Sequence, residues 1–195
     1  MKYKLLVLDV DGTLLNDAKE ISKRTLASLL KVQQMGIRVA LASGRPTYGL
    51  MPLAKTLELG NYGGFIISYN GGQIINAQNG EILFERRINP EMLPYLEKKA
   101  RKNNFAIFTY HDDTILTDSS DNEHVHAEAN LNNLKIIQEE EFSTAIDFAP
   151  CKCILVSNDE EALKRFGRAL EKTLGRNAGC FLLGTLLSGS RALRN

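Results

Sequence analysis

The first 70 residues alternate between continuous apolar runs and amphipathic segments, which is typical of strands and helices in α/β proteins. Leu5 to Leu8 form the first apolar run, which predicts a strand buried on both faces of a parallel sheet. Ser22 is a suitable N-cap for a helix that ends before Gly36. The predicted elements are a strand at 5–8, a helix at 23–34, a strand at 37–42, a helix at 47–57 and a strand at 63–68. This order favours parallel strands joined by right-handed crossovers.

The pattern changes after Gly72, where short strands replace the long apolar runs. Asn79-Gly80 separates two of these strands and is a strong hairpin turn. The predicted elements are strands at 73–77, 81–86, 105–110, 114–117, 135–138 and 152–156, with helices at 90–102, 121–134 and 159–174. We interpret this mixed block as a second domain that begins near residues 84–89.

Composition narrows the class of protein. The chain has 195 residues, 44% hydrophobic and 24% charged, which is ordinary globular composition with room for a sizeable core. A net charge of +1 gives no reason to expect a nucleic-acid partner. No apolar run reaches the roughly 18 residues of a membrane span, and the N-terminal run is too short for a signal peptide, so a soluble, cytoplasmic protein is expected.

The cysteines and histidines carry weak signals. The chain has three cysteines, an odd count without a secretory signal, so a disulfide framework is not expected. Cys151 and Cys153 could indicate metal or redox chemistry, but two buried thiols on a strand are preferred because alternate strand residues share a face. His124 and His126 would point to different faces of a helix, so solvent-exposed side chains are preferred to a metal pair. Residues 111–113 are expected to form a turn.

Polar residues gather where each of the first three strands ends. In open α/β sheets the site lies beyond the carboxyl ends of the strands. Each group taken alone also fits a plain turn or helix cap, but together they predict one site at one edge of the sheet. The residues are Asp9, Asp11, Gly12 and Thr13 after the first strand, Ser43, Gly44 and Arg45 after the second, and Asn70 and Gly71 after the third.

The string Asp9-Val10-Asp11-Gly12-Thr13-Leu14 resembles the first motif of the haloacid dehalogenase (HAD) superfamily, in which phosphatases dominate. Ala42-Ser43-Gly44-Arg45 and Asn70-Gly71 resemble its Cof-type branch, which has a class IIB cap. The resemblance implies an α/β fold with a partial Rossmann-like (HAD) parallel-sheet core and an inserted α/β cap domain. The implied domains are a core at 1–84 and a cap at 85–187, followed by an atypical tail at 188–195.

The resemblance also implies a reaction, the Mg²⁺-dependent hydrolysis of small phosphomonoesters, with sugar phosphates expected. Asp9 would be the nucleophile and form an aspartyl-phosphate, and Asp11 would be the general acid and base. The Asp9 carboxylate and the Asp11 carbonyl would bind Mg²⁺. Thr13 and Ser43 would hold phosphoryl oxygens. The remaining residues implied in substrate binding are Gly12, Gly44, Arg45, Asn70 and Gly71.

The sequence departs from the family pattern after the cap. The family pattern has a Lys and an acidic Gly-Asp-x-x-Asn-Asp-like motif there, whereas the last Lys is Lys172 and the last acid is Glu171. Truncation or a frame shift is the preferred explanation, and a remodelled site completed by another chain is the alternative. The chain alone is then expected to be a poor phosphatase. The alternative function is a non-catalytic fragment that binds phosphate weakly or self-associates through a bare strand at 5–8.

Overall fold

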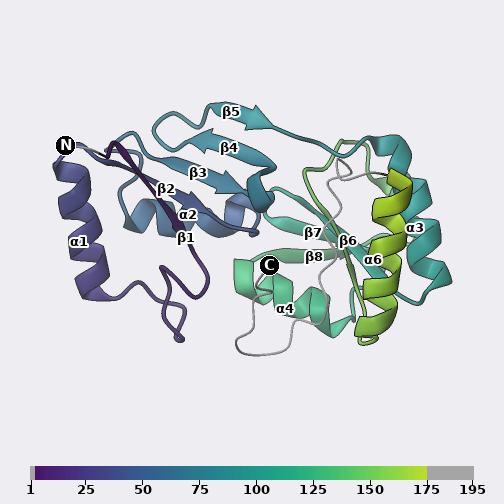
Figure 1. Cartoon of the computed structure of the whole chain (residues 1–195). Helices are drawn as coiled ribbons and strands as arrows, with labels where there is room; N and C mark the ends of the chain where they lie inside the picture. Colours follow the sequence, from purple (N-terminus) through teal and green to yellow (C-terminus); the bar gives the residue numbers. More distant parts are fainter. Residues whose placement is uncertain (1–2, 175–195) are drawn as a thin grey trace. The chain divides into compact units, whose positions relative to one another are not determined.

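The computed structural model describes residues 3–174 (Figure 1). The chain divides into two compact units, Met1–Glu85 and Arg86–Asn195, called here the N-terminal and the C-terminal unit. Predictions that concern residues 175–195, including Cys180, the last part of the implied cap and the implied tail, lie outside the described residues. Within residues 3–174, no helix is both long and apolar enough to cross a membrane.

The N-terminal unit is built on one five-stranded sheet with the order β1-β2-β3-β4-β5. The first three strands are parallel and the last two form an antiparallel hairpin, as the sequence pattern predicts. The elements of this unit are β1 (Leu5–Asp9), α1 (Lys23–Gln34), β2 (Arg38–Ala42), α2 (Thr47–Thr56), β3 (Phe65–Ser68), a 3-10 turn η1 (Tyr69–Gly71), β4 (Gln73–Asn76) and β5 (Ile82–Glu85).

Helices α1 and α2 both pack on the same face of this sheet. Leu29 of α1 and Leu50 of α2 share one apolar cluster with the alternate strand residues Val39, Leu41 and Ile66. The predicted boundaries of α1 agree with the structure. At its N-cap, Ser22 Oγ accepts a hydrogen bond from the Thr25 amide, as the sequence predicts. Gly36 follows α1 with a φ of 85°, a conformation that favours glycine. Burial on this face therefore fixes the parallel strands and aligns their carboxyl ends.

The prediction that residues 5–8 are buried on both faces is wrong. Strand β1 is an edge strand of the sheet, and Leu5 and Val7 are 47% and 49% exposed. Leu6 and Leu8 point to the other face and pack against the core under α1 and α2. Among the described residues, β1 has no neighbour beyond β2, so the expected bare apolar edge is present.

The C-terminal unit has a four-stranded sheet with the order β8-β7-β6-β9 (Figure 1). Only the β7–β8 pair is parallel, so this sheet is mixed. Its elements are a 3-10 turn η2 (Pro90–Met92), α3 (Leu93–Lys102), β6 (Ala106–His111), β7 (Thr114–Thr117), α4 (Glu123–Asn132), β8 (Lys135–Gln138), α5 (Phe142–Ala145), β9 (Cys153–Val156) and α6 (Glu160–Leu174). The hairpin β4–β5 that follows Gly72 belongs to the first sheet, and the strands of the second sheet all come after Glu85.

The two faces of the second sheet have different coverings. One face packs against α3, α5 and α6 in an apolar core that includes Ile107, Leu155 and Leu163. The other face carries a buried polar group beside α4, where the Tyr110 hydroxyl donates to Glu128 Oε1 at 2.7 Å. Lys152 is 5% exposed, and its burial lowers the pKa of the ammonium, an effect that the charge of Glu128 opposes.

Three details of this unit differ from the sequence predictions. His124 is buried, whereas an exposed side chain was expected, and its ring shares a 2.7 Å hydrogen bond with the Asn158 side chain. His126 is exposed as expected. Cys153 is buried in β9, but Cys151 precedes the strand and is only half-buried. The short helix α5 was not predicted, since its four residues are too few to show a helical period.

Candidate active site

Three loops meet at the carboxyl edge of the first sheet. In the parallel register Asp9 is paired with Ala42, so the loops after β1 and β2 begin side by side. The Ser43 amide donates to the Ile67 carbonyl at 2.9 Å, and the Asn70 amide donates to the Ser43 carbonyl at 3.0 Å. These bonds tie the loop after β2 to the loop after β3. The structure thus brings together the strand-end residues that the sequence singled out.

Asp9 lies at the end of β1 with an exposed side chain. The Thr13 hydroxyl donates to Asp9 Oδ2 at 3.0 Å, and among residues 3–174 this is the one hydrogen bond of the Asp9 carboxylate. Gly12 allows the chain to turn back between them, with a φ of 78° and nothing within 4 Å of an added Cβ. Thr13 therefore orients one carboxylate oxygen of Asp9 and leaves the other accessible to a ligand.

Asp11 is held in a two-pronged ion pair. Arg45 Nε donates to Asp11 Oδ2 at 2.8 Å and Arg45 Nη2 donates to Oδ1 at 2.7 Å, the geometry in which guanidinium binds a carboxylate best. Lys19 Nζ adds a third contact to Oδ1 at 3.2 Å. Partial burial raises the pKa of Asp11, but hydrogen bonding and charge attraction from Arg45 and then Lys19 outweigh it and bring the pKa below its usual value. Asp11 is therefore a stabilised carboxylate in this conformation.

The loops after β2 and β3 lie in very close contact. An added Cβ on Gly44 would lie 3.1 Å from Asn70 Nδ2, so only glycine fits at this position without moving Asn70. Asn70 and Gly71 both have positive φ, 58° and 86°. Asn70 tolerates this backbone because its short side chain is compatible with the left-handed region. The Ser43 hydroxyl accepts a 3.2 Å hydrogen bond from the Arg45 amide, which closes a tight turn ahead of α2.

The sequence did not identify two parts of this site. Lys19 pairs with Asp11 from a polar loop eight residues away, and no motif or period marks it. A chain of hydrogen bonds also joins α2 to the hairpin, from Thr47 Oγ1 to Gln73 Oε1 at 2.6 Å and from Gln73 Nε2 to Glu85 Oε1 at 2.7 Å. Both depend on loop conformations that bring distant residues together, which a linear pattern cannot show.

The acids at this edge carry oxygen donors of the kind found in magnesium sites. Among residues 3–174, no cluster of three or more histidine, cysteine or acidic side chains could hold a metal ion. The exposed Asp9 carboxylate and the Asp11 carbonyl are hard oxygen donors of the kind that Mg²⁺ prefers. Mg²⁺ commonly takes one or two carboxylates and completes its shell with water and substrate phosphate. These donors therefore fit Mg²⁺ in kind, and they would supply part of its shell.

Sequence comparison identifies the family. The profile of the haloacid dehalogenase-like hydrolases matches residues 6–185. The chain belongs to this family, and its α/β fold and three strand-end loops agree with that assignment. A Streptococcus pyogenes protein that carries a provisional phosphatase name is 37% identical over 81 residues, which are 42% of this chain and 30% of that protein.

Structural comparison gives the same result. A crystal structure of a haloacid dehalogenase-like hydrolase from Bacteroides thetaiotaomicron has a TM-score of 0.83 and 44% identity, and covers 89% of this chain and 65% of its own. The structure of a subclass IIB sugar phosphatase shares the fold, with a TM-score of 0.57 and 20% identity over 72% of this chain and 55% of its own. The Cof-type resemblance and the fold class predicted from the sequence are confirmed. The chain spans less than two thirds of the length of each of these relatives.

Proposed function

We propose that the protein hydrolyses small phosphomonoesters, with sugar phosphates as the expected class, and that Asp9 is the nucleophile. The observation that carries this proposal is the exposed Asp9 carboxylate, oriented by Thr13 at 3.0 Å at the end of a parallel strand. Its neighbours across the sheet edge are Ser43 and Arg45, which suit phosphoryl oxygens. Family membership and the phosphatase names of its relatives support the same reaction class.

The proposed reaction has two steps. The free carboxylate oxygen of Asp9 attacks phosphorus, the bond between phosphorus and the ester oxygen breaks, and the leaving alcohol takes a proton from Asp11. Water then attacks phosphorus of the aspartyl-phosphate and gives its proton to Asp11. The bond between phosphorus and the Asp9 oxygen breaks, so phosphate leaves and the Asp9 carboxylate is regenerated. A bound Mg²⁺ would supply positive charge that offsets the repulsion between carboxylate and phosphate.

The Asp11–Arg45 ion pair bears on the first step. A proton donor must be protonated, whereas Arg45 and Lys19 hold Asp11 in its charged form. We infer that Asp11 releases Arg45 when substrate binds, because the incoming phosphate offers the guanidinium a second anion. Arg45 would then move its charge from the acid to the phosphate, and Asp11 would regain its ability to hold a proton.

Phosphate release by the purified chain tests the proposal. We expect Mg²⁺-dependent hydrolysis of p-nitrophenyl phosphate and of hexose phosphates that EDTA abolishes. The rate is expected to be roughly 10²- to 10³-fold below that of a relative with a complete metal shell, the usual effect of losing one electrostatic stabiliser. Equal phosphate release with Mg²⁺ and with EDTA would contradict the proposal. Equal rates on p-nitrophenyl and hexose phosphates would contradict only the sugar-phosphate class.

A second proposal is that β1 mediates self-association. The observation that favours it is an apolar edge strand with Leu5 and Val7 about half exposed, which is a template for pairing with another strand. We expect Val7→Lys to lower the mass measured by light scattering at high protein concentration, because a charge on the edge strand opposes pairing. Ala27→Lys, at an exposed position of α1, is the control because it adds the same single charge away from the edge strand. An unchanged, concentration-independent monomer mass for the wild-type chain would exclude this association.

A further inference from the structure

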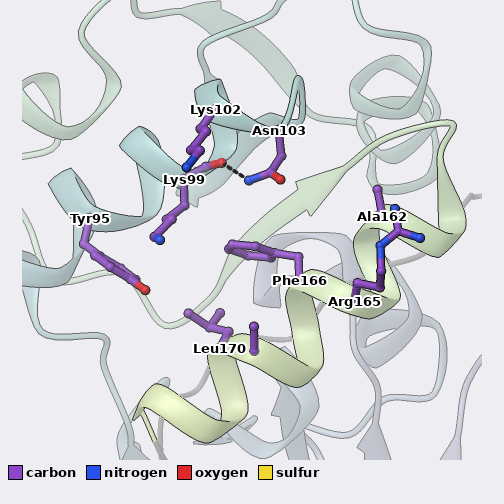
Figure 2. Close-up of a pocket in the computed structure, with 9 residues that line it drawn as sticks. Tyr95, Lys99, Lys102, Asn103, Ala162, Arg165, Phe166 and Leu170 are labelled. Atoms are coloured by element: carbon purple, nitrogen blue, oxygen red, sulfur yellow. Dashed lines mark hydrogen bonds between the residues drawn. The ribbon is translucent and has the colours of Figure 1, made fainter.

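A groove lies between α3 and α6 of the C-terminal unit, with a cavity volume of about 320 Å³. It belongs to a different unit from Asp9 and shares no residue with the candidate active site. Figure 2 shows Tyr95 and Lys99 of α3 pointing toward the same space as Phe166 of α6. We call it the α3–α6 groove.

The floor of the groove is aromatic and held in place. Phe166 is half-buried, and its ring makes an edge-to-face contact with the buried Phe105, with ring centres 5.7 Å apart. Tyr95 is also half-buried, and Lys99 Nζ lies 5.3 Å from the centre of its ring. Partly exposed aromatic faces of this kind bind planar rings by stacking.

Among the described residues, the charged side chains around the floor are all positive. Lys99, Lys102 and Arg165 line the groove, and none of the described lining residues is acidic. Within the described part of the chain none of these three cations forms an ion pair. Neighbouring cations on the same helices do, since Arg101 pairs with Glu97 and Lys164 pairs with Glu160 and Glu161. The groove therefore presents unneutralised positive charge next to an apolar surface.

Small side chains on α6 create the space. Ala162 and Ala169 lie seven residues apart, two turns on the same side of the helix as Phe166. Larger side chains at these positions would occupy the groove. The volume of about 320 Å³ lies at the lower end of the usual range for small-molecule sites, roughly 300–1,000 Å³. One ring system with one anionic group matches this size, whereas a larger ligand would extend into solvent.

We propose that the α3–α6 groove binds a small molecule that joins a planar ring to a phosphate group, of the class of nucleoside monophosphates. The ring stacks on Phe166 and Tyr95, and the phosphate lies between Lys99 and Lys102. A phosphate group carries about 1.5 to 2 negative charges at neutral pH, which suits two lysines. The proposal is independent of the chemistry at Asp9.

Calorimetric titration of the full chain with AMP tests this binding. EDTA is included so that metal-dependent hydrolysis does not take place during the titration. We expect saturable binding with one AMP per chain. The double variant Lys99→Ala/Lys102→Ala is expected to bind AMP at least about tenfold more weakly, because it removes both phosphate contacts. Ala169→Leu fills the groove from an exposed helical position and is expected to abolish binding without changing the thermal unfolding midpoint.

The matched control is Lys98→Ala/Arg168→Ala, which removes the same charge from exposed positions on the same two helices and is expected to bind AMP like the wild type. Adenosine and glycerol phosphate, which each lack one half of the ligand, are expected to bind at least about tenfold more weakly than AMP. The proposal is overturned if AMP shows no saturable binding at millimolar concentration. It is also overturned if the control weakens binding as much as the groove variant, or if glycerol phosphate binds as tightly as AMP.

Discussion

Asp9→Asn is expected to lower phosphate release by about 10³-fold or more, because an amide oxygen is a far poorer nucleophile than a carboxylate. The fold should be unaffected. Asp9 is exposed at the strand end, and an asparagine oxygen can still accept the Thr13 hydrogen bond. The measurement is Mg²⁺-dependent release of phosphate from p-nitrophenyl phosphate, together with the thermal unfolding midpoint of both proteins.

Asp17→Asn is the matched control for this change. Asp17 is an exposed acid in the loop after β1 and has no ion pair among the described residues, so its substitution removes one charge near the site and no contact. We expect full activity from this variant. Brief reaction followed by acid quenching and mass measurement should also trap one phosphoryl group on the wild-type chain and none on Asp9→Asn. Activity of Asp9→Asn comparable to that of the wild type would remove Asp9 from the role of nucleophile.

Local pattern was sufficient for the secondary structure of the N-terminal unit. Apolar runs, the Ser22 cap and the Asn79-Gly80 turn act over a few residues, so they can be recognised in the sequence. The convergence of Asp9, Ser43 and Asn70 also follows from local pattern, because parallel strands place their carboxyl ends at one edge. These parts of the fold depend on short-range chemistry and on one general rule of topology.

Pairings between distant residues could not be predicted in the same way. The exposure of Leu5 and Val7 depends on which strands flank β1. A central strand and an edge strand can have the same apolar sequence, so the sequence of β1 alone does not distinguish them. The burial of His124 depends on Asn158, which lies 34 residues away. Arg45 was expected to attract phosphate, but its bidentate contact with Asp11 depends on how two loops lie across the sheet edge.

The Asp11–Arg45 pair makes the second large prediction, a change in pH dependence. Burial raises the pKa of Asp11, while Arg45 and then Lys19 lower it by more, so the pKa lies below its usual value. In the proposed first step Asp11 must carry a proton, so the rate falls as pH rises through the pKa of Asp11. Arg45→Ala removes the larger of the two attractions, which raises this pKa and moves the falling limb of the kcat/KM profile to higher pH.

Arg45→Ala should also lower the plateau of kcat/KM on the acidic side of the limb, by about 10- to 100-fold. This is the usual size of losing one charged hydrogen bond, here from the guanidinium to the phosphate. The measurement is kcat/KM for p-nitrophenyl phosphate from about pH 3 to about pH 7, a range that reaches the acidic region where a carboxyl of lowered pKa titrates. A lower plateau combined with a limb displaced to higher pH distinguishes the two effects of Arg45, because loss of phosphate binding alone would lower the curve without moving it.

Lys19→Ala separates these effects further. Lys19 contacts only one oxygen of Asp11, at 3.2 Å, and its side chain is 55% exposed, so water screens most of its charge. Its removal should move the limb in the same direction as Arg45→Ala but by less, with little change in the plateau because Lys19 has no proposed contact with phosphate. Limbs that stay in place in both variants would show that the ionisation of Asp11 does not govern the rate. A limb that moves to lower pH would show that the rate-limiting acid is a different group.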